Sequence, residues 1–309
     1  MEIVTKTKIK GLLPVPSQDG VRDIYALPQD KQLIVYTDRT PVYDDILDQP
    51  VPYRGVVLNQ ISLYWIKKFT HMVGNTLVAR QPLPEEALPY ASMLEGRSLI
   101  VQKLKPLPLV FRVVGNLFGD DWDEYLETSR LGTRLLAKGM KESDRLENPV
   151  LLISFAGDLS TQDVDDMQKW AQRMYGQKLF TTLEEICLSI FGVARNYALA
   201  RGMIIADTKF EFSLFEGNPY IINDVMTPDS STFWPNEGFV RGRPQPSYDK
   251  QGLYDWLQKH GWVEGQPFPK ISPGILTETS KRYREIFDVM TGKIVKKGED
   301  EDIMAAVAN

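Results

Sequence analysis

Apolar residues recur every three or four positions in five segments of the chain, and this spacing is typical of amphipathic helices. The predicted helices cover residues 62–69, 164–175, 183–201, 252–260 and 278–291. In the longest of them Ile186, Ile190 and Val193 follow the pattern, and Gly202 supplies a natural C-terminal stop.

Short runs rich in β-branched and aromatic residues predict strands. The runs cover residues 21–25, 32–36, 98–103, 110–114, 203–206, 209–214 and 220–223. Pro28, Gln29 and Asp30 separate the first two runs, and residues 215–219 separate the last two. These are turn-forming residue types, so both pairs are expected to form hairpins.

The order of the elements indicates the fold class. Strands come first, then a mixture, then helices, without a repeating strand-helix-strand rhythm, which favours an α+β fold with two lobes. We expect an antiparallel β-rich lobe over residues 1–104 and a larger mixed lobe with C-terminal helices over 105–295. The acidic residues 296–309 are expected to form a flexible tail.

Composition narrows the class of protein. The chain has 309 residues, of which 43% are hydrophobic and 25% charged, as in globular proteins. A single cysteine, Cys187, and the lack of a long apolar run predict a cytoplasmic protein without a membrane partner. With 41 acidic against 36 basic residues the net charge is −5, which argues against nucleic-acid binding. Any phosphate chemistry must therefore be local.

The densest chemical signal lies in residues 206–212 and 223–234. If residues 209–214 form a strand, Asp207, Lys209 and Glu211 share one face, because strand side chains alternate. A hairpin partner carrying Asp224 would bring a second carboxylate close to Glu211. Two converging carboxylates suit Mg²⁺, and a lysine beside them suits phosphate oxygens.

The alternative is a solvated strand face with a Lys-Glu cross-strand pair, which contributes little to stability. From spacing alone this alternative is the commoner arrangement, so both interpretations stay open at this point.

Further motifs occur in the same order as in the SAICAR synthetase family, which the chain resembles from about residue 20 to 292. They are Val21-Arg22-Asp23-Ile24-Tyr25, Thr37-Asp38-Arg39, residues 55–62, 206–212 and 227–234, Ser247-Tyr248-Asp249-Lys250-Gln251, residues 279–283 and Thr291-Gly292. The resemblance implies a two-lobed ATP-dependent ligase. Such enzymes phosphorylate a substrate carboxylate to an acyl phosphate, which an amine, L-aspartate in the family reaction, converts into an amide.

The resemblance also implies roles for individual residues. Glu211 and Asp224 would hold Mg²⁺, Lys209 would contact the activated carboxylate, and Arg22 would face the ATP phosphates. The adenine slot would lie between the N-terminal sheet and residues 101–104, which include Val101 and Lys103. The substrate-binding residues implied are Asp38 and Asp44 in the cleft, Asn59 on a loop there, and Asp207, Asp229 and Ser230.

Several positions depart from the family pattern. Val114 and Thr232 stand where the family has arginines that hold the carboxyaminoimidazole ribotide, and Asp120 replaces a serine. Gly20 replaces a lysine of the first phosphate loop. Each arginine lost from an anion contact is worth roughly 1.5 to 3 kcal/mol. Arg112, two positions before Val114, lies on the same strand face and is a candidate replacement.

Because these losses concern the substrate half, the sequence favours the hypothesis of a divergent ligase that activates another carboxylate and joins it to an amino acid or amine. The first alternative is a SAICAR synthase of purine biosynthesis in which Arg112, Arg130, Arg134, Arg241 or Arg243 supplies the missing cations. The second alternative is a nucleotide-binding regulator without catalysis. The sequence leaves the two substrates and a homo-oligomeric state open.

Overall fold

A computed structural model describes residues 2–17, 19–43, 45–78, 81–156 and 164–294. Asp44, a predicted substrate ligand, and the predicted tail at 296–309 lie outside these ranges. No helix in the described ranges is long and apolar enough to cross a membrane.

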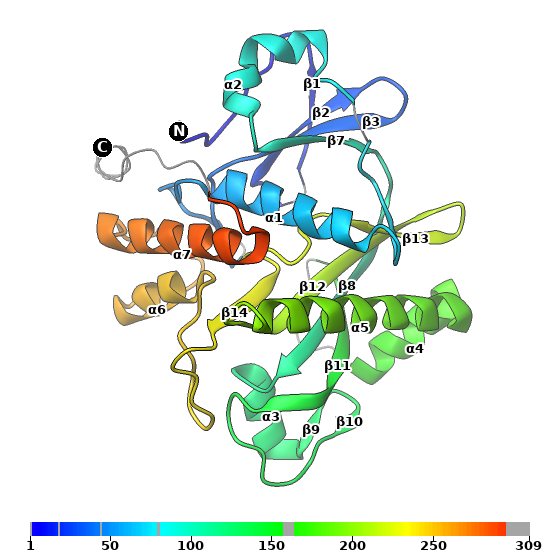
Figure 1. Ribbon diagram of the computed structural model, residues 1–309, viewed down its shortest axis with the longest axis vertical. Coiled ribbons are helices and arrows are strands. Elements are labelled where there is room, and N and C mark those ends of the chain that lie inside the picture. The colour runs from blue at the N-terminus through cyan, green and yellow to red at the C-terminus, as the bar shows by residue number, and fades with distance from the viewer. Residues whose placement is uncertain (1, 18, 44, 79–80, 157–163, 295–309) are drawn as a thin grey trace.

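The first sheet comes from the N-terminal part of the chain and has the antiparallel order β1-β2-β3-β7. Its strands are β1 (Leu13–Val15), β2 (Arg22–Leu27), β3 (Lys31–Tyr36) and β7 (Ser98–Gln102). The β2–β3 hairpin turns at Gln29 and Asp30, whose φ angles are 62° and 52°. Tyr25, Leu33 and Ile100 form a small core with residues of η1 (Glu85–Tyr90) and α2 (Ala91–Leu94), at the top of Figure 1.

The second sheet has six strands in the order β11-β8-β12-β13-β6, with β14 paired to β12. The strands are β6 (Gly74–Asn75), β8 (Pro106–Asn116), β11 (Arg145–Phe155), β12 (Met203–Phe215), β13 (Asn218–Ile222) and β14 (Ser231–Pro235). Two short pairs complete the strands, β4 (Pro41–Val42) with β5 (Asp45–Ile46) and β9 (Arg130–Leu131) with β10 (Arg134–Leu135). The α+β class is confirmed.

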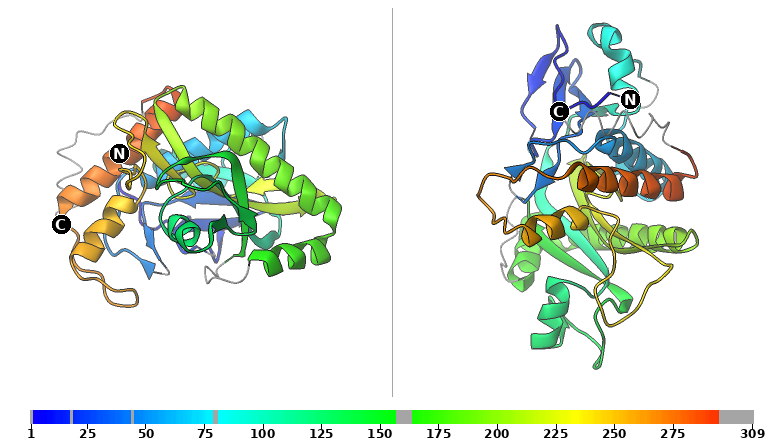
Figure 2. Two further views of the ribbon diagram at one scale, coloured as in Figure 1. Left: turned by 90° about the horizontal axis from the view of Figure 1, so that it is seen from below. Right: turned by 90° about the vertical axis from the view of Figure 1, so that its left-hand side faces the viewer.

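The helices are α1 (Arg54–Phe69), α3 (Asp120–Thr128), α4 (Val164–Tyr175), α5 (Gln177–Leu199), α6 (Gln251–Lys259) and α7 (Pro273–Thr291). Helix α5 packs on β12, so that Phe210 and Phe212 are buried with Phe191 in the main core. Helices α1 and α7 pack together, and Figures 1 and 2 show them between the two sheets. Since α1 contributes to the main core, the larger lobe draws on both halves of the chain. The division at residue 104 stays a prediction.

Two elements differ from the prediction, each for a physical reason. Residues 203–215 form one strand rather than two, because β12 continues through Asp207 and Thr208 with a register shift in its pairing to β14. The sequence analysis missed α3, whose first turn is acidic and which buries just Asp121 and Tyr125. Elements with so few apolar positions give no periodic signal.

Candidate active site

The face of β12 that points away from α5 carries the charged residues. Lys209 is exposed and Glu211 half-buried, while Phe210 and Phe212 on the opposite face are buried. The predicted alternation is therefore confirmed. It follows that Asp207, Lys209 and Glu211 line the same face of the six-stranded sheet.

The β12–β13 hairpin brings Asp224 to this face. Glu211 pairs with Ile222 at the end of β13, and Asn223 follows with a left-handed φ of 60°. The Asn223 amide donates a hydrogen bond to Glu211 and accepts one from Arg22 Nη1 at 3.0 Å. Asn223 therefore links Glu211 on β12 to Arg22 on the N-terminal sheet.

Asp224 lies in an unusual environment. Its Oδ1 is buried and has no hydrogen-bond partner among the described residues. Burial raises the pKa of this carboxyl to about 6, although Arg22 opposes the shift. A buried carboxylate oxygen without a partner costs free energy, so its presence points to a ligand that the fold itself does not supply.

Glu211 and Asp224 fit a magnesium ion. Both offer hard oxygen atoms, and Mg²⁺ commonly binds through one or two carboxylates together with substrate phosphates and water. No group of three or more His, Cys, Asp or Glu side chains suited to a metal occurs in the described part of the chain. A two-carboxylate site that relies on a nucleotide agrees with that finding.

A cavity of about 510 Å³ lies between the two lobes. Its walls include Ile34 and Tyr36 of the first sheet and Val101 and Lys103 at the connection to the second lobe. Arg22 and Asn223 line the same cavity, so one end of it adjoins Glu211 and Asp224. The residues assigned to the predicted adenine slot therefore line this cavity, and the slot itself stays a prediction.

Arg22 is the cation at the inner end of the cavity. Its Nε donates to Asp19 at 2.5 Å. Burial disfavours the charged guanidinium, but the carboxylates of Asp19 and Asp224 outweigh this and raise the pKa of Arg22. Arg22 therefore stays charged where the predicted nucleotide phosphates would lie.

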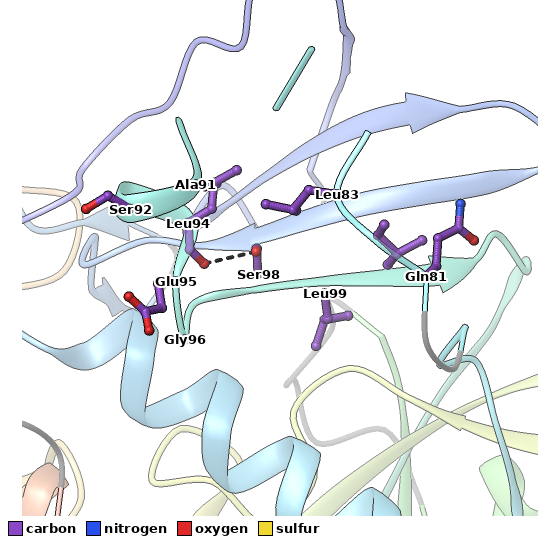
Figure 3. A pocket seen from close by; sticks show the side chains of 10 residues that line it. Gln81, Leu83, Ala91, Ser92, Leu94, Glu95, Gly96, Ser98 and Leu99 are labelled. Carbon is purple, nitrogen blue, oxygen red and sulfur yellow. Dashed lines mark hydrogen bonds between the residues drawn. The ribbon is translucent and has the colours of Figure 1, made fainter. Parts of the chain in front are cut away.

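A second cavity, shown in Figure 3, lies between β7 and the segment of α2 and has a volume of about 530 Å³; Leu99 lines both cavities. Ser92, Glu95 and Gln81 line it, together with Leu83 and Leu99. None of the residues that the sequence predicts for the site lines this cavity. It is therefore separate from the candidate active site.

Arg112 and Asp207 meet on the charged face. Arg112 donates from Nε to Asp207 at 2.6 Å, and from its two terminal nitrogens to Asp121 at 2.9 and 2.8 Å. Asp207 also accepts a hydrogen bond from the Thr232 backbone at 3.2 Å. Lys209 lies opposite Arg112 in the sheet register. Desolvation lowers the pKa of Lys209, with Arg112 contributing.

Asp229 and Ser230 lie beside this face, and each makes a different contact. Asp229 pairs with Arg54 at 2.5 Å and accepts a hydrogen bond from Tyr283 at 2.7 Å. Burial opposes ionisation, but Arg54 and Lys250 hold the pKa of Asp229 well below its usual range. The Ser230 carbonyl accepts a hydrogen bond from the Lys209 backbone at 2.7 Å. Ser230 therefore holds the backbone of Lys209, while Asp229 joins the neighbouring turn to Arg54 on α1 and Tyr283 on α7.

The structure does not bring Asp38 and Asn59 to the charged face. Asp38 is fully buried and accepts hydrogen bonds from the Gly55 backbone and from Arg97. Asn59 is also buried and donates to the Gly96 carbonyl at 2.8 Å, so it fixes the turn before β7. As substrate ligands both residues stay predictions without geometric support, and Asp44 lies outside the described residues.

Sequence reasoning missed Asn223 and Asp19, which hold Glu211 and Arg22, and Asp249, a half-buried residue near Asp207. Burial raises the pKa of Asp249 to about 6. Asp249 lies in a matched motif and could have been found there. The roles of Asn223 and Asp19 depend on contacts that join distant segments.

Comparison with known proteins identifies the family. The sequence profile of the SAICAR synthetase family matches residues 18–268. The chain belongs to the SAICAR synthetase family. It is therefore an ATP-dependent carbon-nitrogen ligase.

Two named relatives are similar to this chain over nearly its full length. The phosphoribosylaminoimidazole-succinocarboxamide synthase of Maridesulfovibrio salexigens is 41% identical over 290 residues, covering 93% of this chain and 97% of the relative. That of Citrifermentans bemidjiense is 38% identical and covers 94% and 98%.

Solved structures of SAICAR synthases have the same fold as this chain. The Saccharomyces cerevisiae SAICAR synthase in complex with SAICAR superimposes with a TM-score of 0.84 and 33% identity, covering 95% of this chain and all of that one. A SAICAR synthetase in complex with ADP shares the fold at a TM-score of 0.63 and 17% identity.

The hypothesis of a divergent ligase for another carboxylate is wrong. Relatives about 40% identical over almost their whole length carry the SAICAR synthase name. The hypothesis rested on departures from the family pattern at a few positions, namely Gly20, Val114, Asp120 and Thr232. In the fold, Arg112 donates a hydrogen bond to Asp207 on the charged face, and its part in substrate binding stays a prediction.

Proposed function

We propose that this chain is a phosphoribosylaminoimidazole-succinocarboxamide synthase, which joins L-aspartate to carboxyaminoimidazole ribotide at the expense of ATP. The observation that carries the proposal is the buried Oδ1 of Asp224, which has no hydrogen-bond partner among the described residues. Asp224 follows Asn223, which lines the cavity and bonds both Glu211 and Arg22. Full-length similarity to enzymes of this name supports the choice of substrates.

In this proposal, residues of both lobes bind the nucleotide and its metal ion. The cavity wall at Val101 and Lys103 would hold the nucleotide base, and Arg22 would face the phosphates. Mg²⁺, held by Glu211 and Asp224, would neutralise charge on the transferred phosphoryl group. Phosphoryl transfer depends mainly on positioning and charge neutralisation, which these side chains provide.

Lys209 is placed to hold the carboxylate that is activated. Lys209 is an exposed residue on the face shared with Glu211, and in the described ranges no ion pair engages its ammonium. The substrate carboxylate oxygen would take the γ-phosphoryl group with release of ADP. The aspartate amine would then attack the acyl carbon, phosphate would leave, and the nitrogen would lose a proton.

The Asp224 carboxyl makes metal binding pH-dependent. Because its pKa is raised to about 6, the carboxyl gains a proton as the pH falls through that value, and a protonated carboxyl is a poor metal ligand. We expect the affinity for Mg²⁺ in the presence of a non-hydrolysable ATP analogue to fall between pH 7 and pH 5. Titration of Mg²⁺ at several pH values measures this affinity. An affinity that does not change between pH 7 and pH 5 would contradict the prediction.

ADP release from the purified protein tests the proposed function. With Mg-ATP we expect ADP release to require carboxyaminoimidazole ribotide, and amide formation to require L-aspartate as well. ADP released in equal amounts without the amine would indicate a kinase that discharges its acyl phosphate. Nucleotide binding without any turnover would indicate a regulator. Cytoplasmic location and homo-oligomer formation stay predictions.

A further inference from the structure

Asp249 lies at the end of the charged face that is farther from the metal site. Along β12, Asp207 and Glu211 lie on opposite sides of Lys209, each two residues away and roughly 6 to 7 Å along the strand. Asp207 pairs with Thr232 of β14 and accepts a hydrogen bond from its backbone at 3.2 Å. The Thr232 side chain in turn hydrogen-bonds Asp249. A nucleophile that attacks a carboxyl group at Lys209, with the phosphoryl group at the metal, would approach from the side of Asp249.

No cation is paired with the Asp249 carboxylate among the described residues. The ammonium of Lys250, the next residue, donates to the Pro41 carbonyl at 3.2 Å and lies 3.7 Å from Asp229. Oδ1 of Asp249 accepts a hydrogen bond from the Gln251 backbone at 2.7 Å. Burial raises the pKa of Asp249 to about 6, although its hydrogen bonds oppose the rise. At neutral pH the carboxylate is therefore ionised and able to accept a proton.

The other titratable groups around Asp249 are already engaged. Asp207 on β12 accepts a hydrogen bond from Arg112 Nε at 2.6 Å. Tyr283 on α7 donates to Asp229 at 2.7 Å. The two carboxylates assigned to the metal lie at the other end of the face. Asp249 is thus the carboxylate at this end that no side-chain cation holds in the described ranges.

Amide formation from L-aspartate requires a group that accepts a proton. An alkyl amine is an ammonium ion at neutral pH, and its nitrogen then has no lone pair with which to attack. A positioned general base contributes roughly 100- to 10,000-fold to such a step and acts best when its pKa lies near the working pH. Asp249 meets both conditions, by its place on the face and by its raised pKa.

We propose that Asp249 is the general base of amide formation and removes a proton from the ammonium group of L-aspartate. The inference rests on the proposed function. The freed nitrogen lone pair attacks the acyl carbon of the acyl phosphate, so the C–N bond forms and the C–O bond to phosphate breaks. The departing phosphate takes the electron pair of that bond and a second proton from the nitrogen. Asp249 then releases its proton to water.

The test compares two nucleophiles in the variant Asp249→Asn. Asparagine keeps an oxygen that can accept from the Gln251 backbone but cannot take up the proton. Asp255→Asn is the matched control, because Asp255 is an exposed acid on α6 that bonds the Gln251 side chain at 2.8 Å. Each protein is supplied with Mg-ATP, carboxyaminoimidazole ribotide and either L-aspartate or hydroxylamine. Hydroxylamine is largely unprotonated at neutral pH, so its attack needs no base.

We expect Asp249→Asn to form the succinocarboxamide roughly 100- to 10,000-fold more slowly than the unmodified protein, the range for loss of a general base. With hydroxylamine it should form the hydroxamate at the rate of the unmodified protein. The control variant should react normally with both nucleophiles. Equal losses with the two nucleophiles would indicate a structural role and overturn the inference, as would an undiminished reaction with L-aspartate.

The pH dependence of the unmodified protein supplies a second measurement that does not require the variant to fold. With saturating L-aspartate we expect kcat to stay constant from pH 7 to pH 8.5, because Asp249 is ionised throughout and deprotonates the bound ammonium. A rise of about tenfold per pH unit would show that the free amine is the reacting species and would contradict the inference. No product from the unmodified protein with either nucleophile would instead overturn the proposed function.

Discussion

Asp224→Asn should lower turnover of Mg-ATP on the order of 1,000-fold while the protein stays folded. A metal ion at a transferring phosphoryl group supplies several kcal/mol of charge stabilisation, and each 1.4 kcal/mol corresponds to a factor of ten in rate. Among the described residues, Asp224 Oδ1 is buried and has no hydrogen-bond partner, so removing the charge removes a cost of burial. The melting temperature should therefore not fall.

Initial-rate measurements with saturating substrates, together with thermal unfolding, check this prediction. Glu211→Gln should lose activity to a similar degree, because Glu211 shares the proposed metal. Asp255→Asn is the matched control, since Asp255 is an exposed acid on α6 whose carboxylate bonds Gln251. Full activity of the Asp224 or Glu211 variant would remove the metal assignment.

The second large effect concerns stability. Arg54→Met should lower the free energy of unfolding by about 3 to 5 kcal/mol, the range for breaking a buried ion pair from one side. The Arg54 and Asp229 side chains are 2% and 8% exposed, so the variant leaves a buried carboxylate without its main counter-ion. Tyr283 and Lys250 remain near Asp229 but replace just part of that interaction.

Urea unfolding measures the effect of the Arg54 variant. Arg241→Met is the comparison, because the Arg241 side chain is 60% exposed. Solvent screens exposed ion pairs, so this variant should change the free energy of unfolding little. Equal losses of stability in the two variants would contradict the claim that burial makes the loss of the Arg54–Asp229 pair costly.

Much of the fold can be predicted from local patterns. The β2–β3 hairpin, the alternation along β12 and the positions of α4 and α6 follow from periodicity and turn residues. The acidic helix α3 and the unbroken length of β12 do not, because they depend on pairing and contacts with distant strands. Contacts between distant segments cannot be read from the local pattern of a single sequence.

The candidate site is divided in the same way. The strand pattern predicts that Glu211 and Lys209 share a face, and the hairpin turn predicts that Asp224 is near. The structural use of Asp38 could not be predicted, because its partners Arg97 and Gly55 come from other segments. The substrate inferred from single departures such as Val114 and Thr232 was wrong, because relatives similar over nearly their whole length are named for the family reaction.

Formation of the succinocarboxamide product tests the central claim most directly. The purified protein, Mg-ATP, L-aspartate and carboxyaminoimidazole ribotide would be combined, and the product detected by mass, with the Asp224→Asn variant as the inactive control. The account predicts product in step with ADP release from the unmodified protein and almost none from the variant. Absence of the succinocarboxamide from the unmodified protein, while it binds Mg-ATP, would contradict the account.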